Sequence, residues 1–558
     1  MDNQRLILFL IFSFSLVMLW DAWQKQGTPG QVANPPAATA TVAAPAAGGA
    51  AAPVPVPTAE TIPTAAAQAV PVDTAAKLLV TTDLFVAEVS AQGGDLTRLE
   101  FRAHKATGDK NSNFVLFEAK HAYAAQGGLI GPGLPTHKTV WQLPAGGLEM
   151  KDGDQELRVR LTAPAADGVQ VAKTFVFKRG SYLIDVEYEI ANGSAAAIAP
   201  HAYFQLTRDG QAPEGANAMM STFTGPAFYT DAEKFQKLDF ADVAKKKAKV
   251  PGKADNGWVA MVQHYFVAAL LPGPGEREYF LREIGKDLYA AGVIVPVAQI
   301  APGASGKVAV PLFAGPQEQD KLAAVAPGFD LVVDYGWLTV IAAPLFWVLQ
   351  WVHGFVGNWG WAIILLTVLI KGAFFPLSAA SYKSMAKMRV LTPKLQKLKE
   401  TYGDDKQRLN QEMMEMYKKE KVNPLGGCLP ILVQIPVFIA LYWVLMGTVE
   451  MRGAPWILWI TDLSAADTLF GHIPLINLPL GPLPLLMGAT MFIQTKLNPT
   501  PPDPIQAKIM LWMPIVFTFM FLGFPAGLVL YWTVNNLLSI AQQWQVNRMI
   551  EASGLTAK

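Results

Sequence analysis

The chain has 558 residues, which is too long for a single ordinary domain. Hydrophobic residues make up 51% of it, and 45 basic residues nearly balance 44 acidic ones, so it lacks the basic excess of a nucleic-acid-binding protein. Its single cysteine, Cys428, excludes an intramolecular disulfide and a cysteine metal cluster. Long uncharged runs lie at the two ends of the chain, which indicates membrane segments there and a soluble region between them.

The first predicted element is the apolar run from Leu6 to Trp20. Its length of roughly 15 to 18 residues is short for a membrane span and also fits the core of a signal peptide. No small-residue cleavage site follows directly, because Asp21, Trp23 and Lys25 come next. We therefore expect residues 1–26 to form an uncleaved transmembrane anchor, with a cleaved signal peptide as the alternative.

Residues 27–76 form the second region and consist mostly of Ala, Pro, Val, Thr and Gly. This composition does not supply a hydrophobic core, and repeated prolines favour extended segments. The sequence therefore predicts a disordered linker with no role beyond its reach.

Residues 77–330 have a different pattern. Apolar and charged residues alternate along 157–161 and 184–190, and Asp-Gly, Arg-Gly and Asn-Gly pairs bound the alternating runs. Alternation with period two predicts antiparallel sheet with one wet face. We expect an all-β sandwich of two sheets, with a short helix around residues 317–325.

The C-terminal third begins with an uncharged run that glycines interrupt between residues 354 and 360. Its first part, within 331–357, is rich in Trp and contains Pro344, so we expect an amphipathic helix in the membrane interface. The second part starts at Trp359 and is expected to span the membrane.

Three more uncharged runs follow: 423–449, a Pro- and Gly-broken run that ends at Lys496, and 509–547. The last would reach about 58 Å as one helix, so we expect two helices that fold back at 524–527. Residues 358–552 are thus predicted to hold five spans, and the chain six transmembrane helices with the anchor.

The loop at 380–422 is strongly basic, whereas Arg452 is the only basic residue in 450–484. The positive-inside rule places the basic loop in the cytoplasm. Counting spans then puts both termini in the cytoplasm and the β domain in the periplasm.

The same loop carries apolar residues at helical spacing on both sides of 402–405, which predicts an antiparallel helical hairpin, with Thr392-Pro393 as a helix restart. Flexible methionines suit varied apolar partners, although a solvated connector is the alternative. The candidate contact residues are Met385, Met388, Asp404, Asp405, Met413 and Met416.

Lys371 is the most informative charge in the chain, because it lies in the apolar stretch 359–377 with no acidic residue nearby. An unpaired cation at the centre of a span costs roughly 2.5–3.5 kcal/mol, so it usually faces water or protein. Polar residues in the other spans favour a hydrophilic cavity. Helix-to-helix hydrogen bonds are the alternative for each of them, and a structural charge is the alternative for Lys371.

Signals of catalysis are missing from the sequence. The seven histidines have no metal-ligand spacing, and neither a phosphate-binding glycine loop nor a nucleophile elbow occurs. We expect no catalytic residue, metal or cofactor, and no bond-breaking activity.

Several long motifs resemble the YidC/Oxa/Alb family of membrane protein insertases. The motifs are Met1–Arg5, Asp334–Trp337, Ser384–Met388, Asp404–Arg408, Lys421–Cys428, Gln434–Phe438 and Phe524–Leu528. The likeness covers nearly the whole chain and is most specific from Asp334 onward. The external domain is similar to the β-supersandwich of Gram-negative members.

The resemblance implies a protein of the bacterial inner membrane that inserts and helps to fold membrane proteins through a groove in the inner leaflet. Lys371 falls where many members have Arg, and Trp532 falls where many have Tyr. The expected groove residues are Lys371, Thr367, Gln434, Tyr531, Trp532, Asn535 and Ser539. The expected partners are nascent membrane proteins, the Sec translocon, ribosomes or targeting factors, and the phospholipid bilayer.

Two other classes of function remain open at this level. Lys371 would also suit a transporter of an anionic solute, although no internal repeat is visible. The β domain would suit a sugar-binding or sensory protein, but fold analogy alone supports that.

Overall fold

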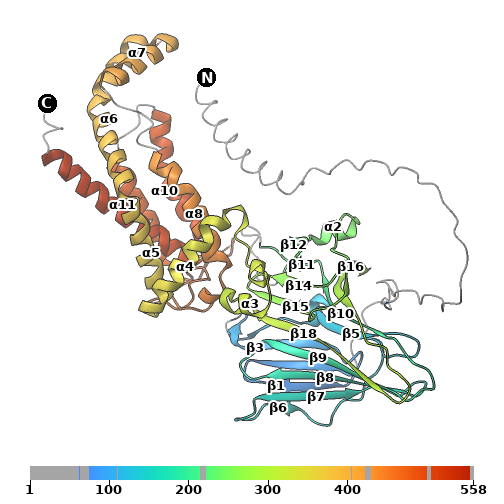
Figure 1. The fold of residues 1–558 in the computed structure, drawn as a ribbon. Coiled ribbons are helices and arrows are strands. Elements are labelled where there is room, and N and C mark those ends of the chain that lie inside the picture. Colours follow the sequence, from blue (N-terminus) through green and yellow to red (C-terminus); the bar gives the residue numbers. More distant parts are fainter. Residues whose placement is uncertain are drawn as a thin grey trace, which may run out of the picture. The chain divides into compact units, whose positions relative to one another are not determined.

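The computed structural model describes residues 62, 75–107, 109, 111–213, 222–403, 405–420, 429–474, 476–498 and 504–552. It contains an all-β domain and a C-terminal helical part (Figure 1). The expected anchor at 1–26 and nearly all of the linker at 27–76 lie outside the described residues.

The first sheet of the β domain has ten strands, and most neighbours pair antiparallel, with β1 and β6 as a parallel pair. Their order is β13 (Lys253–Ala254), β16 (Arg277–Gly285), β17 (Leu288–Pro296), β10 (His201–Asp209), β5 (Ala124–Ile130), β3 (Leu96–Lys105), β2 (Phe85–Ser90), β1 (Lys77–Thr81) and β6 (Leu148–Glu149), with β4 (Asn113–Val115) paired to β3.

The second sheet has eight strands, all antiparallel. Their order is β12 (Lys234–Lys237), β11 (Gly225–Thr230), β14 (Trp258–Gln263), β15 (Phe266–Leu270), β18 (Ser305–Pro316), β9 (Leu183–Asn192), β8 (Val169–Lys178) and β7 (Glu156–Thr162).

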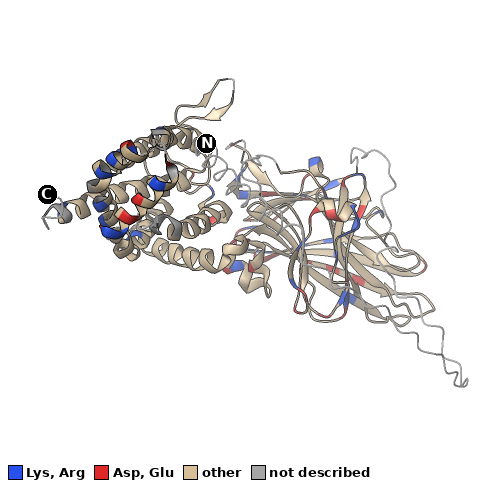
Figure 2. Cartoon of the chain, turned by 90° about the horizontal axis from the view of Figure 1, so that it is seen from above, with Lys and Arg blue, Asp and Glu red and all other residues tan. Residues whose placement is uncertain are grey.

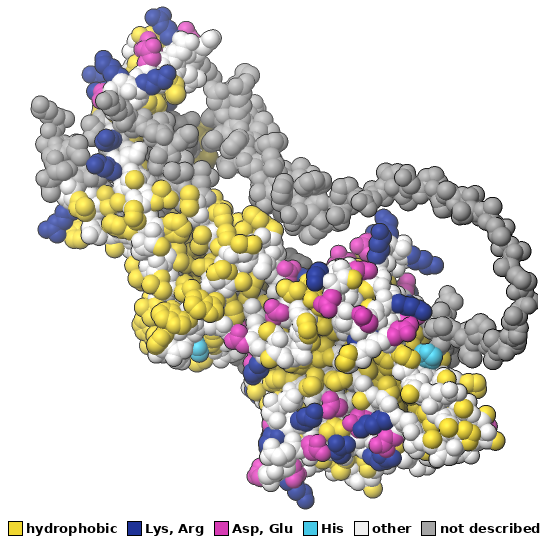
Figure 3. Space-filling model, viewed as in Figure 1, with side chains coloured by type: hydrophobic (Ala, Val, Ile, Leu, Met, Phe, Trp, Pro, Cys, Tyr) yellow, Lys and Arg dark blue, Asp and Glu magenta, His cyan; other side chains and the backbone are white. Residues whose placement is uncertain are grey.

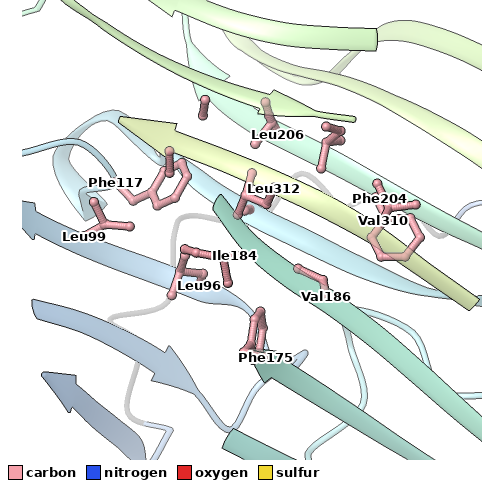
Figure 4. Close-up of a cluster of buried hydrophobic side chains, with 14 of the residues drawn as sticks. Leu96, Leu99, Phe117, Phe175, Ile184, Val186, Phe204, Leu206, Val310 and Leu312 are labelled. Carbon is pink, nitrogen blue, oxygen red and sulfur yellow. The ribbon is translucent and has the colours of Figure 1, made fainter. Parts of the chain in front are cut away.

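The core lies between the two sheets, as Figure 4 shows for side chains from β3, β8, β9, β10 and β18. Along β9, Ile184, Val186 and Tyr188 are buried, whereas Asp185 and Glu187 are partly exposed. Successive side chains of a strand point to opposite faces, so the alternation in the sequence becomes one dry and one wet face. The predicted two-sheet sandwich is confirmed, and the expected short helix is α3 (Gln319–Val325).

The rest of the described chain is mainly helical (Figure 1). The helices are α4 (Thr339–Val356), α5 (Trp359–Ala373), α6 (Phe375–Tyr402), α7 (Lys406–Lys419), α8 (Leu429–Gly447), α9 (Pro482–Leu497), α10 (Pro504–Phe521) and α11 (Ala526–Ala552). The expected reversal near residues 524–527 falls between α10 and α11 and is therefore confirmed.

Helix α5 exposes large apolar side chains and buries two polar ones among apolar neighbours. Its exposed face carries Trp361, Leu365 and Leu369, while its buried face includes Thr367 and Lys371. Hydrophobic side chains cover much of the helical part in Figure 3. A contiguous apolar surface of this kind marks contact with a membrane or another protein.

Length and apolarity support fewer spans than the sequence suggested. Among the described helices, one segment, Gly336–Val356, passes as a span by itself, and α5 passes together with residues 375–385 as a bent pair. The interfacial position of α4 and the count of six spans therefore stay predictions.

The apolar stretch 359–377, which we expected to span the membrane from Trp359 onward, is not one continuous helix. Helix α5 ends at Ala373, and the chain bends by 63° before the following helix, α6. Pro376 lies in the first turn of α6, where proline is well tolerated because that N–H would have no helical partner. Lys371 consequently lies in the last turn of α5, next to the bend and near the middle of the bent pair that α5 forms with residues 375–385.

The hairpin consists of α6 and α7, and Lys394 forms an ion pair of 2.6 Å with Glu420. Asp405 caps α7 by accepting hydrogen bonds from the N–H groups of Gln407 and Arg408. The expected restart at Thr392-Pro393 is wrong, because α6 continues through Pro393 as one helix of 28 residues. Basic and acidic side chains gather on this end of the helical part (Figure 2).

Candidate functional site

The candidate site is built around the ammonium group of Lys371. The side chain is 5% exposed, and its Nζ donates a hydrogen bond of 2.8 Å to Oγ of Ser539. Among the described residues, no carboxylate forms a salt bridge with it. In this structure neighbouring protein groups therefore cover the ammonium group, and a neutral hydroxyl accepts its hydrogen bond.

Helix α11 supplies the polar face opposite Lys371. Asn535, Ser539 and Gln542 follow one another at spacings of four and three residues, which places them on one helical face. Oγ of Ser539 donates to the carbonyl of Asn535 at 2.7 Å, and Nε2 of Gln542 donates to the carbonyl of Lys371 at 3.2 Å. Gln542 thus belongs to the site, although it is not among the expected groove residues. Its position three residues after Ser539 places it on the same helical face, and this spacing could have predicted it from the sequence.

A second polar face of α11 joins this helix to α9. Nδ2 of Asn536 donates to Oγ1 of Thr490 at 3.3 Å, and Nε2 of Gln543 donates to the carbonyl of Leu497 at 3.1 Å. Both amide side chains are 4% exposed. For Asn536 and Gln543 the simpler explanation, hydrogen bonding between helices, is therefore sufficient.

Two other expected groove residues, Thr367 and Gln434, lie on α5 and α8. Thr367 is buried one turn before Lys371 and donates to the carbonyl of Ile363 at 2.7 Å. Gln434 is half-buried on α8, and no hydrogen bond among the described residues joins it to Lys371. The structure therefore brings Lys371 together with Thr367 and Ser539 but not directly with Gln434.

The two aromatic residues of α11 pack against Phe438 of α8. Tyr531 is 2% exposed, and its ring stacks on that of Phe438 with centroids 6.1 Å apart. Trp532 is half-buried and meets the same ring edge-on at 4.4 Å. Nε1 of Trp532 has no hydrogen-bond partner among the described residues, so this indole retains a donor for a further group.

The expected hairpin contacts are partly described. Met385, Met388, Met413 and Met416 are half-buried, Asp405 serves as the cap of α7, and Asp404 lies outside the described residues. An open groove between α6 and α7 has Leu398 and Met416 in its lining, together with three lysines and three glutamates. It combines a small apolar patch with charges of both signs.

Metal chemistry has no visible support in the described residues, since they contain no group of three His, Cys, Asp or Glu side chains able to hold an ion. The arrangement around Lys371 offers binding instead. It provides one cation, several amide and hydroxyl groups, and an apolar exterior.

Two family models match this chain. One is described as the YidC periplasmic domain and matches residues 77–348, and the other is described as 60Kd inner membrane protein and matches residues 351–553.

Full-length relatives match as well. The chain is 63% identical to the membrane protein insertase YidC of Aromatoleum aromaticum, over 100% of both chains. It is 60% identical to the membrane protein insertase YidC of Dechloromonas aromatica, over 100% of this chain and 99% of that one. A crystal structure described as an active YidC insertase with the first transmembrane domain resolved is similar at 18% identity and a TM-score of 0.39, over 83% of this chain and 91% of that chain.

Proposed function

Because this chain belongs to the YidC family of membrane protein insertases, we propose that it inserts integral membrane proteins into the bacterial inner membrane and helps them to fold. The observation that carries the proposal is Lys371, a buried cation that a hydroxyl rather than a carboxylate holds, on a helix with an apolar exterior. Since no carboxylate among the described residues forms a salt bridge with this ammonium group, the charge is available to an anionic ligand.

The proposed substrate is a polypeptide segment whose polar leading tail must cross hydrocarbon. Each charge on that tail costs several kcal/mol in the bilayer core. A cation within a wet groove would offer an acidic tail a halfway site, and water in the groove would keep the attraction moderate enough for release. The proposed lining consists of Lys371, Thr367, Gln434, Tyr531, Trp532, Asn535 and Ser539.

The bend after α5 supports access from the cytoplasmic side. Lys371 lies two residues before the end of α5, and the chain then turns into the basic hairpin. Under the positive-inside rule the hairpin lies in the cytoplasm, with both termini on that side and the β domain in the periplasm. Lys371 would then lie near the cytoplasmic mouth of the groove.

A structural role is the main competitor for Lys371. A cation in the last turn of a helix is favoured by the helix dipole, typically by 0.3–1 kcal/mol. That contribution is smaller than the cost of burying an unpaired ammonium group, so it does not by itself account for a lysine at this position.

The hairpin and the spans complete the proposal. We expect six transmembrane helices in all, α4 as an interfacial helix, and α6 and α7 as the surface that meets incoming chains, ribosomes or targeting factors, and the Sec translocon. The apolar patch of the hairpin groove with its charged rim suits amphipathic partners. No covalent step is involved, so the protein would not be an enzyme.

Reconstitution tests this function directly. Purified protein in liposomes without any other protein should insert a small single-span substrate faster than empty liposomes do. A second set of liposomes with labelled anionic solutes tests the transporter alternative, which the matched families do not support. Solute flux without insertion would overturn the proposal.

A further inference from the structure

One residue of the Ala- and Pro-rich linker is packed against the β domain. Ile62 is 1% exposed, and it clusters with Tyr203, Phe280 and Ile294, with Ile130 packed beside them. These four partners come from β10, β16, β17 and β5, which are neighbours in the ten-stranded sheet. They lie on the face of that sheet opposite the core side chains Phe204 and Leu206, because strand faces alternate.

Two glycines shape the place where Ile62 lies. Gly292 pairs with Phe280 across the strands, and a Cβ at Gly292 would lie 2.5 Å from the Phe280 ring. A Cβ at Gly128 would lie 2.6 Å from the hydroxyl of Tyr203. Both rings can therefore lie close to the backbone only because these positions have no side chain, and their edges form the walls around Ile62.

Hydrogen bonds hold both the backbone of Ile62 and the ring of its neighbour Tyr203. Nη1 of Arg282 donates a hydrogen bond of 3.3 Å to the carbonyl of Ile62. The hydroxyl of Tyr203 accepts a bond from the N–H of His137 at 3.1 Å and lies 2.6 Å from Nδ1 of the same residue. The β domain therefore contacts Ile62 in two ways: apolar residues pack against its side chain, and Arg282 binds its backbone carbonyl. A chance apolar contact would not require the second interaction.

We propose that Ile62 is an anchor point that docks the linker onto the outer face of the ten-stranded sheet. Pro63 follows it in the sequence and disfavours helical backbone at position 62, and the chain bends at Ile62. In the strand order the docking site is centred on β17 and β10, whereas the linker enters the sheet at β1.

Proteolysis at Glu60 measures docking. Glu60 is the only glutamate in 27–76 and lies two residues before Ile62, so a glutamate-specific protease has one linker site beside the anchor. A protease must bind residues on both sides of Glu60, so Ile62 must leave the sheet before cleavage, and the cleavage rate follows the undocked population when docking is fast. The rates in the full-length protein are divided by those of free peptides of residues 55–68 with the same substitution, which removes the intrinsic preference of the protease.

Ile62→Ser should raise the normalised cleavage rate about tenfold, the factor expected when most of a buried aliphatic contact is lost. Ile62→Val should stay near the original rate, because a β-branched side chain still fills the site. Val70→Ser is the matched linker control and should also stay near it. Equal rates for Ile62→Ser and the original protein, or equal acceleration by Val70→Ser, would overturn the proposal.

Discussion

Removing the hydroxyl of Ser539 tests whether Lys371 faces a hydrated groove or is a dry structural charge. If Lys371 faces a hydrated groove, water replaces the lost hydroxyl in Ser539→Ala, and the free energy of unfolding should change by less than about 1 kcal/mol. A dry ammonium group left without its partner would cost roughly 1.5–3 kcal/mol. Thermal unfolding of the purified protein in detergent measures the difference.

Thr490 is the matched control for this experiment. Its hydroxyl accepts from the buried amide of Asn536, in a contact that joins α9 to α11. Thr490→Ala leaves that amide unsatisfied and should destabilise the protein more than Ser539→Ala does. The reverse order would indicate that Lys371 is a structural charge.

His137 makes the stability of the β domain depend on pH. Burial lowers the pKa of this imidazole from 6.5 to about 4, because the charged ring would lose its water. Between these values the unfolded chain binds more protons than the folded one, so stability falls as the pH falls from 6.5 towards 4. We expect a loss of about 2 kcal/mol from this residue between pH 7 and pH 5.

Replacing the histidine isolates its share of the pH dependence. His137→Asn keeps a polar group near the Tyr203 hydroxyl but does not titrate, so its unfolding temperature should fall less between pH 7 and pH 5. Identical pH dependence in the variant and the original full-length protein would show that this imidazole does not contribute.

At the scale of elements, the hairpin should be separable from the membrane-spanning helices. Deleting Thr392–Lys419 removes the end of α6 and all of α7, which are rich in exposed charge. The shortened protein should stay folded in detergent, yet insert substrates more slowly because capture in the cytoplasm is lost. Undiminished insertion would make the hairpin a simple connector.

Point variants test the hairpin side chains without removing the hairpin, so they separate loss of contacts from the structural effect of the deletion. Met413→Leu with Met416→Leu keeps apolar surface and should keep most activity, whereas serine at both positions should lower it. Equal activity of the leucine and serine variants would exclude these side chains as contacts.

Two prolines show what the sequence allows one to predict about helices. Pro376 marks a real break, since it lies in the first turn of α6 just after the bend. Pro393 follows Thr392, which is a common residue at a helix start, yet α6 passes through it. A proline inside a helix costs about 3 kcal/mol, and packing against the rest of the protein decides whether the helix continues despite that cost. Local sequence therefore does not separate the two cases.

The β domain and the hairpin turn were predictable because their signals are local. Strand alternation fixes which side chains face the core, and Asp405 marks the start of α7 through its capping oxygen. The Lys371–Ser539 contact joins residues far apart in the chain, and so does the docking of Ile62. Spacing within one segment carries no information about such pairs.

At the scale of the whole molecule, short helices should thin the bilayer. Helix α10 has 18 residues, which correspond to about 27 Å against roughly 30 Å of hydrocarbon. A short span is accommodated by local thinning at a modest cost per ångström. We expect bilayer density around α10 to be about 3 Å thinner than elsewhere in a nanodisc, and uniform thickness would contradict this.

The central claim is that Lys371 attracts the acidic tail of an inserting segment. The direct measurement is insertion into liposomes of one single-span substrate carrying either an acidic or a neutral tail, by the original protein and by Lys371→Arg, Lys371→Ala and Lys371→Glu. We expect Lys371→Arg to insert both substrates nearly as well as the original protein. Lys371→Ala should slow insertion of the substrate with the acidic tail more than that of the neutral one, and Lys371→Glu should slow the acidic one most. Equal insertion of both tails by the alanine variant would contradict the electrostatic role and leave Lys371 as a structural charge.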